Sequence, residues 1–206
     1  FNPALTARAF LFFSYPSYMS GSKPWIVQMD GISQATPLLS HSSNLNINYS
    51  WWNMFYGYIP GSVGETSTLA ILIGALILLL TGIGSWRIML STCIGLFITS
   101  LILNRLTGIS DNPMLHLTAI EHFVMGGFAF GMVFMATDPV SSAQTNKGRW
   151  FYGLLIGFMA TVIRCINPAY PEGMMLAILF SNAFAPLFDY SVVQSHIKKR
   201  RLSYEE

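Results

Sequence analysis

The feature that most constrains this sequence is a series of five apolar segments, which lie at about 65–84, 86–104, 118–137, 150–167 and 173–193. Each has roughly the 20 residues that a helix needs to cross the hydrocarbon core of a bilayer. Only 10% of the residues are charged and 52% are hydrophobic, whereas roughly 25% charged residues is usual in soluble domains. We therefore expect an all-α integral membrane protein.

Capping and turn residues predict where these segments begin and end. Ser62 and Glu65 have the Ser-x-x-Glu spacing of a capping box, which predicts that the first helix starts there. Asp138-Pro139 predicts the end of the third segment, because proline has no N–H group and disfavours helix in the residue before it. The chain then divides into an interfacial segment (1–64), a five-helix bundle (65–193) and a basic tail (194–206).

The N-terminal third is rich in aromatic and polar residues rather than in long apolar runs. Residues 1–20 and 41–64 combine prolines with clustered Phe, Tyr and Trp, including Trp51 and Trp52, as is typical of segments at the lipid headgroups. The sequence begins at Phe1 rather than Met, and we expect it to be the C-terminal part of a longer protein.

The distribution of Lys and Arg predicts the orientation, because cytoplasmic loops carry an excess of these residues. If the odd-numbered segments end inside, the basic residues at the cytoplasmic helix ends are Arg87, Lys147, Arg149, Lys198, Lys199, Arg200 and Arg201, and at the outer helix ends only Arg105 and Arg164 remain. This orientation places the C-terminus in the cytoplasm and the loop that contains Thr36 on the opposite side of the membrane.

The net charge, the cysteines, the histidines and Arg164 have simple structural explanations. The formal charge of +2 gives no indication of nucleic-acid binding. Cys93 and Cys165 lie in apolar runs and are expected to act as small hydrophobic residues. His116 and His122 lie six residues apart, on different sides of a helix, which favours interfacial histidines over haem ligands. Arg164 is expected near the outer end of its helix with its head group in water, although a flavin phosphate is an alternative partner.

One polar stretch stands out ahead of the apolar segments. It contains Asp30, Ser33, Ala35 and Thr36 in the pattern Asp-x-x-Ser-x-Ala-Thr. Taken alone, this pattern is better explained by a turn that Asp30-Gly31 and Thr36-Pro37 shape. Five further motifs follow it, at 61–67 (GSVGETS), 126–131 (GGFAFG), 135–141 (MATDPVS), 167–173 (NPAYPEG) and 186–190 (PLFDY).

Together these motifs resemble the family that comprises the B-type subunits of sodium-translocating NADH:quinone oxidoreductases and the D-type subunits of Rnf ferredoxin:NAD oxidoreductases. The last two motifs are more similar to the quinone reductase subunits. The resemblance implies the second five-helix half of a ten-helix, urea-transporter-like fold in a bacterial inner membrane, with the Thr36 loop periplasmic. In this family the last threonine of the polar motif carries FMN through its phosphate, so the resemblance implies FMN on Thr36. Gln34 stands where the family usually has glycine.

The resemblance also implies a function. The chain would pass electrons from NADH-derived carriers toward ubiquinone, coupled to Na⁺ export, with other subunits, ubiquinone, Na⁺ and membrane lipid as partners. It further suggests a non-covalently bound riboflavin. Two alternatives stay open, a D-type subunit of an Rnf complex and a cofactor-free channel of the urea-transporter type.

Further site residues are predicted on both sides of the membrane. Gly64, Glu65 and Thr66 lie at a helix N-terminus on the same side as Thr36, where free N–H groups suit an FMN phosphate or ring oxygen, although a plain helix cap explains them almost as well. Glu121 and Glu172 are expected to act as caps or headgroup-level residues. Gly127 and Gly131 are four residues apart, which favours close helix packing over flavin contact.

Sodium is a hard cation that prefers oxygen ligands, and carboxylates at membrane depth are default functional candidates. Asp138 and Asp189 lie at the cytoplasmic ends of their predicted helices and are the candidate metal residues. Because the helix dipole opposes an acid in the last turn, we expect a compensating cation near Asp189, either Lys198, Arg200 or a passing sodium ion.

Overall fold

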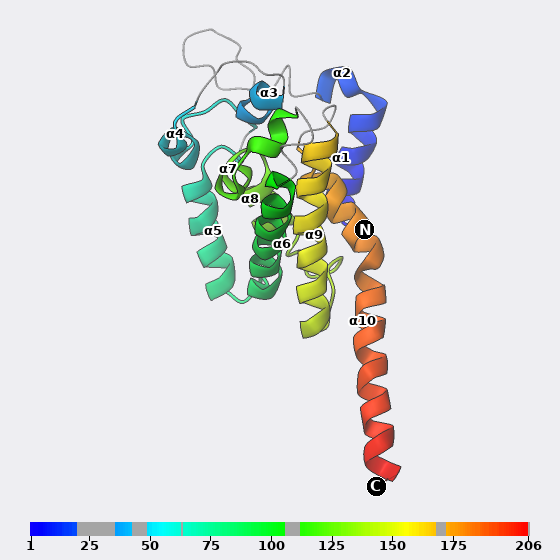
Figure 1. Ribbon diagram of the computed structural model, residues 1–206. Helices are drawn as coiled ribbons and strands as arrows, with labels where there is room; N and C mark the ends of the chain where they lie inside the picture. Colours follow the sequence, from blue (N-terminus) through cyan, green and yellow to red (C-terminus); the bar gives the residue numbers. More distant parts are fainter. Residues whose placement is uncertain (20–35, 43–48, 63, 106–111, 168–171, 206) are drawn as a thin grey trace.

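The computed structural model describes residues 1–19, 36–42, 49–62, 64–105, 112–167 and 172–205, and within these residues every regular element is a helix (Figure 1). The α-helices are α1 (Pro3–Ser14), α2 (Pro16–Met19), α3 (Pro37–Ser42), α4 (Trp51–Tyr56), α5 (Thr68–Leu80), α6 (Trp86–Asn104), α7 (Ala119–Val124), α8 (Phe128–Phe130), α9 (Asn146–Ile166) and α10 (Met174–Glu205). A 3₁₀ helix, η1 (Pro113–His116), and a π-helix, η2 (Gly131–Met135), complete the chain.

Three of these helices are long and apolar enough to cross a membrane, judged over the described residues. They are α6, α9 and the part of α10 from Met174 to Leu202, while α5 is apolar but shorter. The outward faces of α5 and α6 carry large exposed hydrophobic side chains such as Ile73, Leu76 and Leu101. Such continuous apolar surfaces suit contact with lipid tails, so the structure confirms an all-helical protein of membrane type.

The centre of the bundle is the close contact between α6 and α9. A Cβ atom on Gly95 of α6 would lie 2.6 Å from the Leu154 carbonyl oxygen and 3.2 Å from the Cα of Gly157. Gly153 and Gly157, spaced as in G-x-x-x-G, form the matching surface of α9. Small residues at this spacing let two membrane helices approach backbone to backbone.

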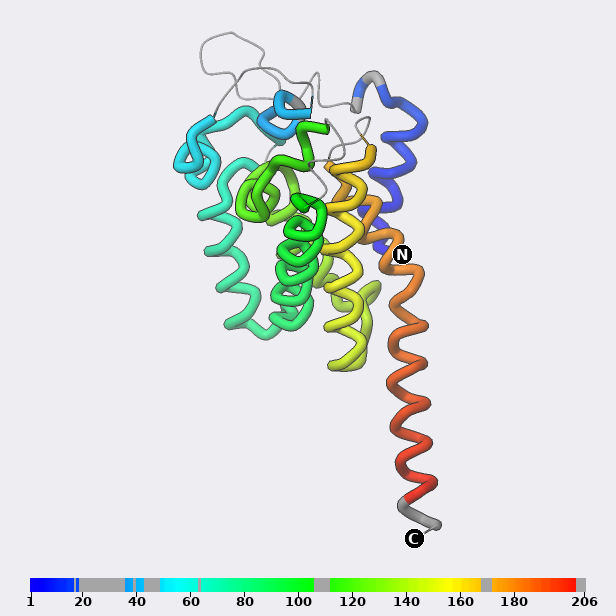
Figure 2. The backbone as a smooth tube through the Cα atoms, viewed as in Figure 1, coloured from blue at the N-terminus to red at the C-terminus, as the bar shows by residue number. Residues whose placement is uncertain are grey.

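The helix α10 packs against α9 and α1 and then continues far past them. Buried residues of its first half, such as Ala177 and Ile178, join the core together with Leu5 of α1. The helix expected to end near residue 193 runs on to Glu205, since no glycine or proline follows Pro186 to stop it. Its last turns extend away from the bundle (Figure 2).

The third apolar segment is not one continuous helix, contrary to the expectation for 118–137. The helix α7 begins with a capping box between Thr118 and Glu121 and ends at Met125, whose backbone is extended. Gly126 then has a φ of +65°, and α8 and η2 resume the helical path after Gly127. The helical path ends at Met135, before Asp138-Pro139, as predicted.

Two helices begin at other residues than predicted. The first membrane helix, α5, begins at Thr68, and its cap is Ser67, whose Oγ accepts the N–H of Ala70 at 3.3 Å. The predicted helix start at Ser62 and Glu65 is therefore wrong. The Ser62 N–H does bind the Glu65 carboxylate at 3.1 Å, as in a capping box, but the two residues form a turn ahead of the helix. The helix α9 begins at Asn146 rather than near 150.

The bundle has two distinct ends (Figure 1). At one end, which we call the Thr36 end, lie α3, α4, η1 and the start of α7. At the other, the basic end, lie the connection between α5 and α6, the start of α9 and the projecting C-terminal part of α10. Arg87, Lys147 and Arg149 belong to the basic end, as do the four consecutive basic residues 198–201.

Candidate functional site

The break in the third segment is the point where three of the sequence motifs meet, beside the segment that follows Thr36. A Cβ atom on Gly126 would lie 3.0 Å from Cδ2 of Leu38, 3.1 Å from Oε2 of Glu172 and 3.3 Å from Nη2 of Arg164. Leu38 follows Thr36 by two residues, and Glu172 belongs to the motif at 167–173. The positive φ and the crowding both require glycine at this position. The break therefore joins segments that are far apart in the sequence.

Arg164 holds this break from within the core. Its side chain is fully buried, and its guanidinium donates to three backbone carbonyls: from Nε to Glu172 at 3.1 Å, from Nη2 to Met125 at 3.2 Å, and from Nη1 to His122. It also lies 5.6 Å from the ring centroid of Phe128. The guanidinium thus satisfies carbonyls that the end of α7 leaves without helical partners.

Two carboxylates flank the other glycine of the break. Oε2 of Glu172 accepts the N–H of Gly127 at 3.0 Å, and a Cβ atom on Gly127 would lie 2.9 Å from Oε2 of Glu65. These residues, with Arg8 and the start of α10, line a cavity of about 20 Å³. A volume of this order holds about one water molecule.

The carboxylate of Glu65 lies in an environment that disfavours its charge. Burial is the main factor that raises its pKa, and the negative charge of Glu172 raises it further. The hydrogen bond from the Ser62 N–H at 3.1 Å and the positive charge of Arg8 act in the opposite direction. The net effect is a pKa above the ordinary value, so Glu65 holds a proton more readily than an exposed glutamate.

Thr36 lies at the start of α3, a short helix that is anchored to the body of the protein. The Thr36 carbonyl accepts the N–H of Ser40 at 2.8 Å, and Leu38 is completely buried in a cluster with Met54 and Met114. Nε2 of His41 lies 3.1 Å from the Pro113 carbonyl oxygen. The attachment residue predicted from the sequence is thus held beside the break. Asp30, Ser33 and Ala35 lie outside the described residues.

The structure brings Gly64, Glu65 and Thr66 to the same end of the bundle as Thr36. Gly64 has a φ of +89°, and a Cβ atom there would lie 3.4 Å from the ring of Phe130. Thr66 packs its methyl group close to Gly61. Because α5 begins only at Thr68, these three residues form a turn that precedes the helix and positions Glu65 at the break.

Asp138 and Asp189, the candidate sodium residues, lie near the basic end and accept hydrogen bonds. Oδ1 of Asp189 accepts the Thr145 N–H at 2.8 Å and the Thr145 hydroxyl at 2.6 Å, and Oδ2 accepts the Gln144 N–H at 2.8 Å. Asp138 accepts the Ser141 N–H and hydroxyl at 3.2 and 2.6 Å. Within the described residues no group of three or more His, Cys, Asp and Glu side chains gathers as a metal site would.

The compensating charge predicted for Asp189 comes from another helix. Lys198 and Arg200 lie nine and eleven residues further along α10, a distance of about 13 Å or more at 1.5 Å per residue. Arg149 of α9 is instead the cation close enough to interact with Asp189. The carboxylate therefore ties α10 to the start of α9.

Other side-chain expectations have mixed outcomes. Arg164 and His122 were expected at the membrane surface, but both are buried, and Nδ1 of His122 finds no hydrogen-bond partner within the described part of the chain. His116 is exposed, Glu121 acts as a helix cap and Cys165 is buried, as predicted. Gly131 packs against Met174, whose Cγ would lie 2.5 Å from an added Cβ atom, in agreement with the helix-packing interpretation.

Sequence reasoning missed the central role of Arg164. The available signal was its position, one arginine inside an apolar segment, where an ionisable residue is costly and usually faces the protein interior. Its three acceptors come from residues between 8 and 42 positions away, and no local pattern reveals such partners.

Comparison with known proteins shows the family of this chain. The family model described as the NQR2, RnfD, RnfE family matches residues 1–198. Curated relatives named as the B-type subunit of Na(+)-translocating NADH-quinone reductase are 54% identical in Chromohalobacter salexigens and Klebsiella pneumoniae and 55% identical in Ectopseudomonas mendocina, each over 97% of this chain. The chain spans about half the length of these relatives, 49% or 50%. The chain is a multi-pass membrane protein that belongs to the NQR2, RnfD, RnfE family.

Proposed function

We propose that this chain is part of a redox-driven sodium pump and carries FMN in phosphoester linkage on Thr36, passing electrons toward ubiquinone. The names of the relatives support the assignment to a sodium-translocating NADH:quinone reductase rather than to an Rnf-type complex. The single observation that carries the proposal is the placement of Thr36 beside the broken helix, through the contact between Leu38 and Gly126. Bound flavin would supply the reversible electron transfer.

The chemistry and the surroundings of Thr36 suit a covalently attached cofactor. A threonine hydroxyl is a weak nucleophile, so its modification needs an enzyme and an activated phosphate donor, together with an accessible sequence outside a long helix. Thr36 meets this condition, since it is only half-buried and precedes α3. The buried Leu38 and the bond between His41 and Pro113 hold the segment in place.

The residues of the break have separate tasks in this proposal. Arg164 neutralises the carbonyl end of α7 and is committed to that role, so the alternative that it pairs with a flavin phosphate is not favoured. Glu65 and Glu172 place negative charge beside the N–H of Gly127. We propose Gly64, Glu65 and Thr66 as the turn that borders the cofactor, and riboflavin as a further, non-covalent cofactor of the complex.

In-gel flavin fluorescence of the denatured protein tests this proposal. The unmodified protein and Thr36→Ser should fluoresce, since serine also offers a hydroxyl, whereas Thr36→Ala should not. Ser62→Ala is the matched control, because it removes an exposed hydroxyl at the same end and keeps the backbone N–H that Glu65 binds. Fluorescence that persists in Thr36→Ala would exclude Thr36, and a wild-type protein without fluorescence would favour the cofactor-free channel.

We propose that the carboxylates of Asp138 and Asp189 interact with sodium ions near the basic end. We expect Asp189→Asn to raise the sodium concentration needed for half-maximal turnover of the complex. Thr145→Ala is the control, because it removes one of the three hydrogen bonds to Asp189 and leaves the carboxylate charge in place. Thermal melting of both variants separates loss of folding from loss of sodium response. An unchanged sodium dependence in Asp189→Asn would refute this role.

We also propose the wider setting. The chain forms the second five-helix repeat of a ten-helix, urea-transporter-like protein, with boundaries at residues 64 and 193, and associates with other subunits in a bacterial inner membrane. The coverage of half the length of its relatives supports a repeat, and the broken third segment resembles the discontinuous helices of many transporters. The basic end is then cytoplasmic and the Thr36 end periplasmic.

A further inference from the structure

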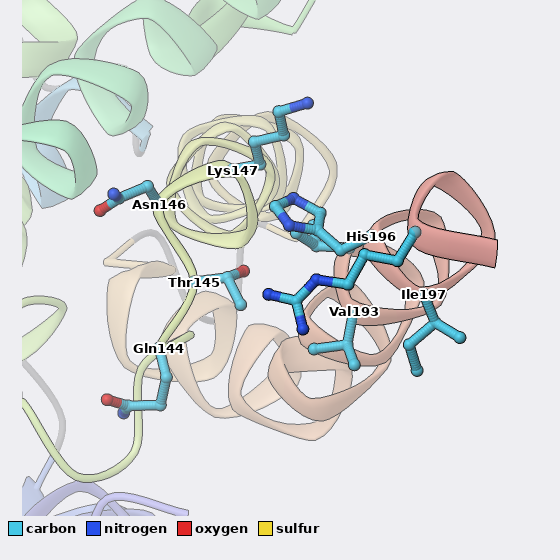
Figure 3. Close-up of a pocket in the computed structure, with 9 residues that line it drawn as sticks. Gln144, Thr145, Asn146, Lys147, Val193, His196 and Ile197 are labelled. Carbon is cyan, nitrogen blue, oxygen red and sulfur yellow. The ribbon is translucent and has the colours of Figure 1, made fainter. Parts of the chain in front are cut away.

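A pocket of about 670 Å³ lies at the basic end, between the start of α9 and the projecting part of α10. Gln144, Thr145, Asn146 and Lys147 form its α9 side, and Val193, His196 and Ile197 lie on its α10 side (Figure 3). The proposed flavin site lies at the opposite end of the bundle, so this pocket is separate from it.

The α10 side of the pocket is one continuous helix face. Val193, His196, Ile197 and Arg200 line it and are spaced at i, i+3, i+4 and i+7, the spacing of residues on the same side of a helix. The other basic residues of this helix, Lys198, Lys199 and Arg201, are exposed and do not line the pocket. Of the four consecutive basic residues 198–201, only Arg200 therefore lines the pocket.

The chemistry of the lining is both basic and apolar. Lys147 and Arg200 carry positive charge, and His196 adds a nitrogen donor or acceptor. Val192, Val193 and Ile197 supply apolar surface, and among the described residues no carboxylate lines the pocket. Asp189 lies nearby, but its oxygens accept hydrogen bonds from Gln144 and Thr145. The lining therefore suits a ligand with an anionic group joined to hydrocarbon.

The position of the pocket matches the edge of a membrane. Trp86 and Trp150 form an edge-to-face pair at 5.9 Å at this end of the bundle, and Arg87 lies 4.9 Å from the centroid of Trp86. Tryptophan and basic residues at helix ends are typical of the headgroup level. Beyond the pocket, toward the bundle, α9 and α10 expose Phe151 and Leu187, which are 56% and 57% accessible. Acyl chains can lie along this surface.

We propose that this pocket binds the headgroup phosphate of an anionic phospholipid, with its acyl chains against α9 and α10. Basic pockets between membrane helices are known to suit such headgroups. A free phosphate ion would leave the apolar lining unused, and an acidic protein segment would leave the hydrocarbon surface above it without a partner. A phospholipid would have partners in both the basic and the apolar part of the pocket.

Native mass spectrometry of the full-length protein tests this site. The protein is stripped of lipid in neutral detergent and titrated with phosphatidylglycerol or, as the neutral comparison, phosphatidylcholine. We expect the wild-type protein to retain phosphatidylglycerol preferentially, and Lys147→Gln/Arg200→Gln to bind it more weakly by about fivefold for each charge removed. Lys199→Gln/Arg201→Gln is the matched control, with the same charge loss on the same helix, and should bind as the wild type does.

A third variant tests whether Lys147→Gln/Arg200→Gln weakens lipid binding only through an indirect effect. Val193→Asp keeps every basic residue and places an acid in the pocket, so it should weaken phosphatidylglycerol binding as well. Equal binding by the pocket and control variants would overturn the proposal. Competition by inorganic phosphate as strong as that by phosphatidylglycerol would show a simple anion site, and crosslinking of Lys147 to an acidic segment of a partner protein would show a protein interface; either result would also overturn it.

Discussion

Arg164 shows how one residue can determine the path of a membrane segment. A buried guanidinium is costly unless its donors are bound, and here each of its three nitrogens donates to a carbonyl, of His122, Met125 or Glu172. Two of those carbonyls belong to the end of α7, just before the break, and the third belongs to the turn that precedes α10. Removing the side chain would therefore leave several buried acceptors without partners.

We expect Arg164→Lys to destabilise the protein nearly as much as Arg164→Gln, because an ammonium group cannot reproduce the planar fork of donors. The loss in either case should be about 3 kcal/mol or more. Thermal unfolding in detergent or nanodiscs measures it, with the exposed Arg105→Gln as control. An Arg164→Lys protein as stable as the wild type would contradict the role assigned to the guanidinium.

Glu65 predicts a pH dependence of stability. Because burial and Glu172 raise its folded-state pKa above the ordinary 4.5, the folded state binds the proton more tightly than the unfolded state does. The resulting stabilisation is full below about pH 4.5 and is lost as the pH rises through the folded-state pKa. Glu65→Gln should remove this dependence and gain stability relative to the wild type as the pH is raised.

Melting temperatures of the wild type and Glu65→Gln, measured from below about pH 4.5 upward, test whether the stability falls as the pH rises. Arg8→Gln is a second informative variant, because the positive charge of Arg8 lowers the pKa of Glu65. Removing this charge should raise that pKa and so increase the stability that is lost as the pH rises. Parallel curves for the wild type and Glu65→Gln would show that Glu65 does not titrate differently in the folded protein.

At the scale of elements, the contact between α6 and α9 depends on glycine. Gly95→Ala would place a methyl group 2.6 Å from the Leu154 carbonyl oxygen, and Gly157→Ala would crowd α6 from the other side. Each should cost about 1–3 kcal/mol, as overpacking in a core does. Leu101→Ala, on the exposed face of α6, is the control. Wild-type melting temperatures for both glycine variants would contradict this packing.

The elements that sequence reasoning located well are those with local signals. The limits of α6 agree with the prediction of 86–104 because a turn at Gly84 and Ser85 precedes an uninterrupted apolar run. The start of α5 was misplaced because Ser62 and Glu65 have capping-box spacing, while the true cap, Ser67, follows five residues later. Local spacing alone does not distinguish the two candidate caps.

The break in the third segment was missed for a different reason. Gly126 and Gly127 lie inside an apolar run. Gly127 and Gly131 were interpreted by their spacing as helix-packing residues, which is correct for Gly131 only. What opens the helix is the set of distant partners, Arg164 for the carbonyls and Glu172 for the Gly127 N–H. Such partners depend on the tertiary fold, so sequence patterns within the segment carry no trace of them.

At the scale of the whole molecule, the sequence motifs separate into two groups at opposite ends. The motifs at 61–67, 126–131 and 167–173 meet at the break beside Thr36, while those at 135–141 and 186–190 contribute Asp138 and Asp189 near the basic end. In the proposed pump these ends are the redox side and the sodium side. The packed helices α6, α9 and α10 run between them.

The measurement that tests this account most directly is the mass of a proteolytic peptide spanning residues 24–53, isolated from the protein purified from its native membrane. The account predicts the addition of one FMN less one water, with fragmentation placing the modification on Thr36. An unmodified peptide, or a flavin located on another residue, would contradict it.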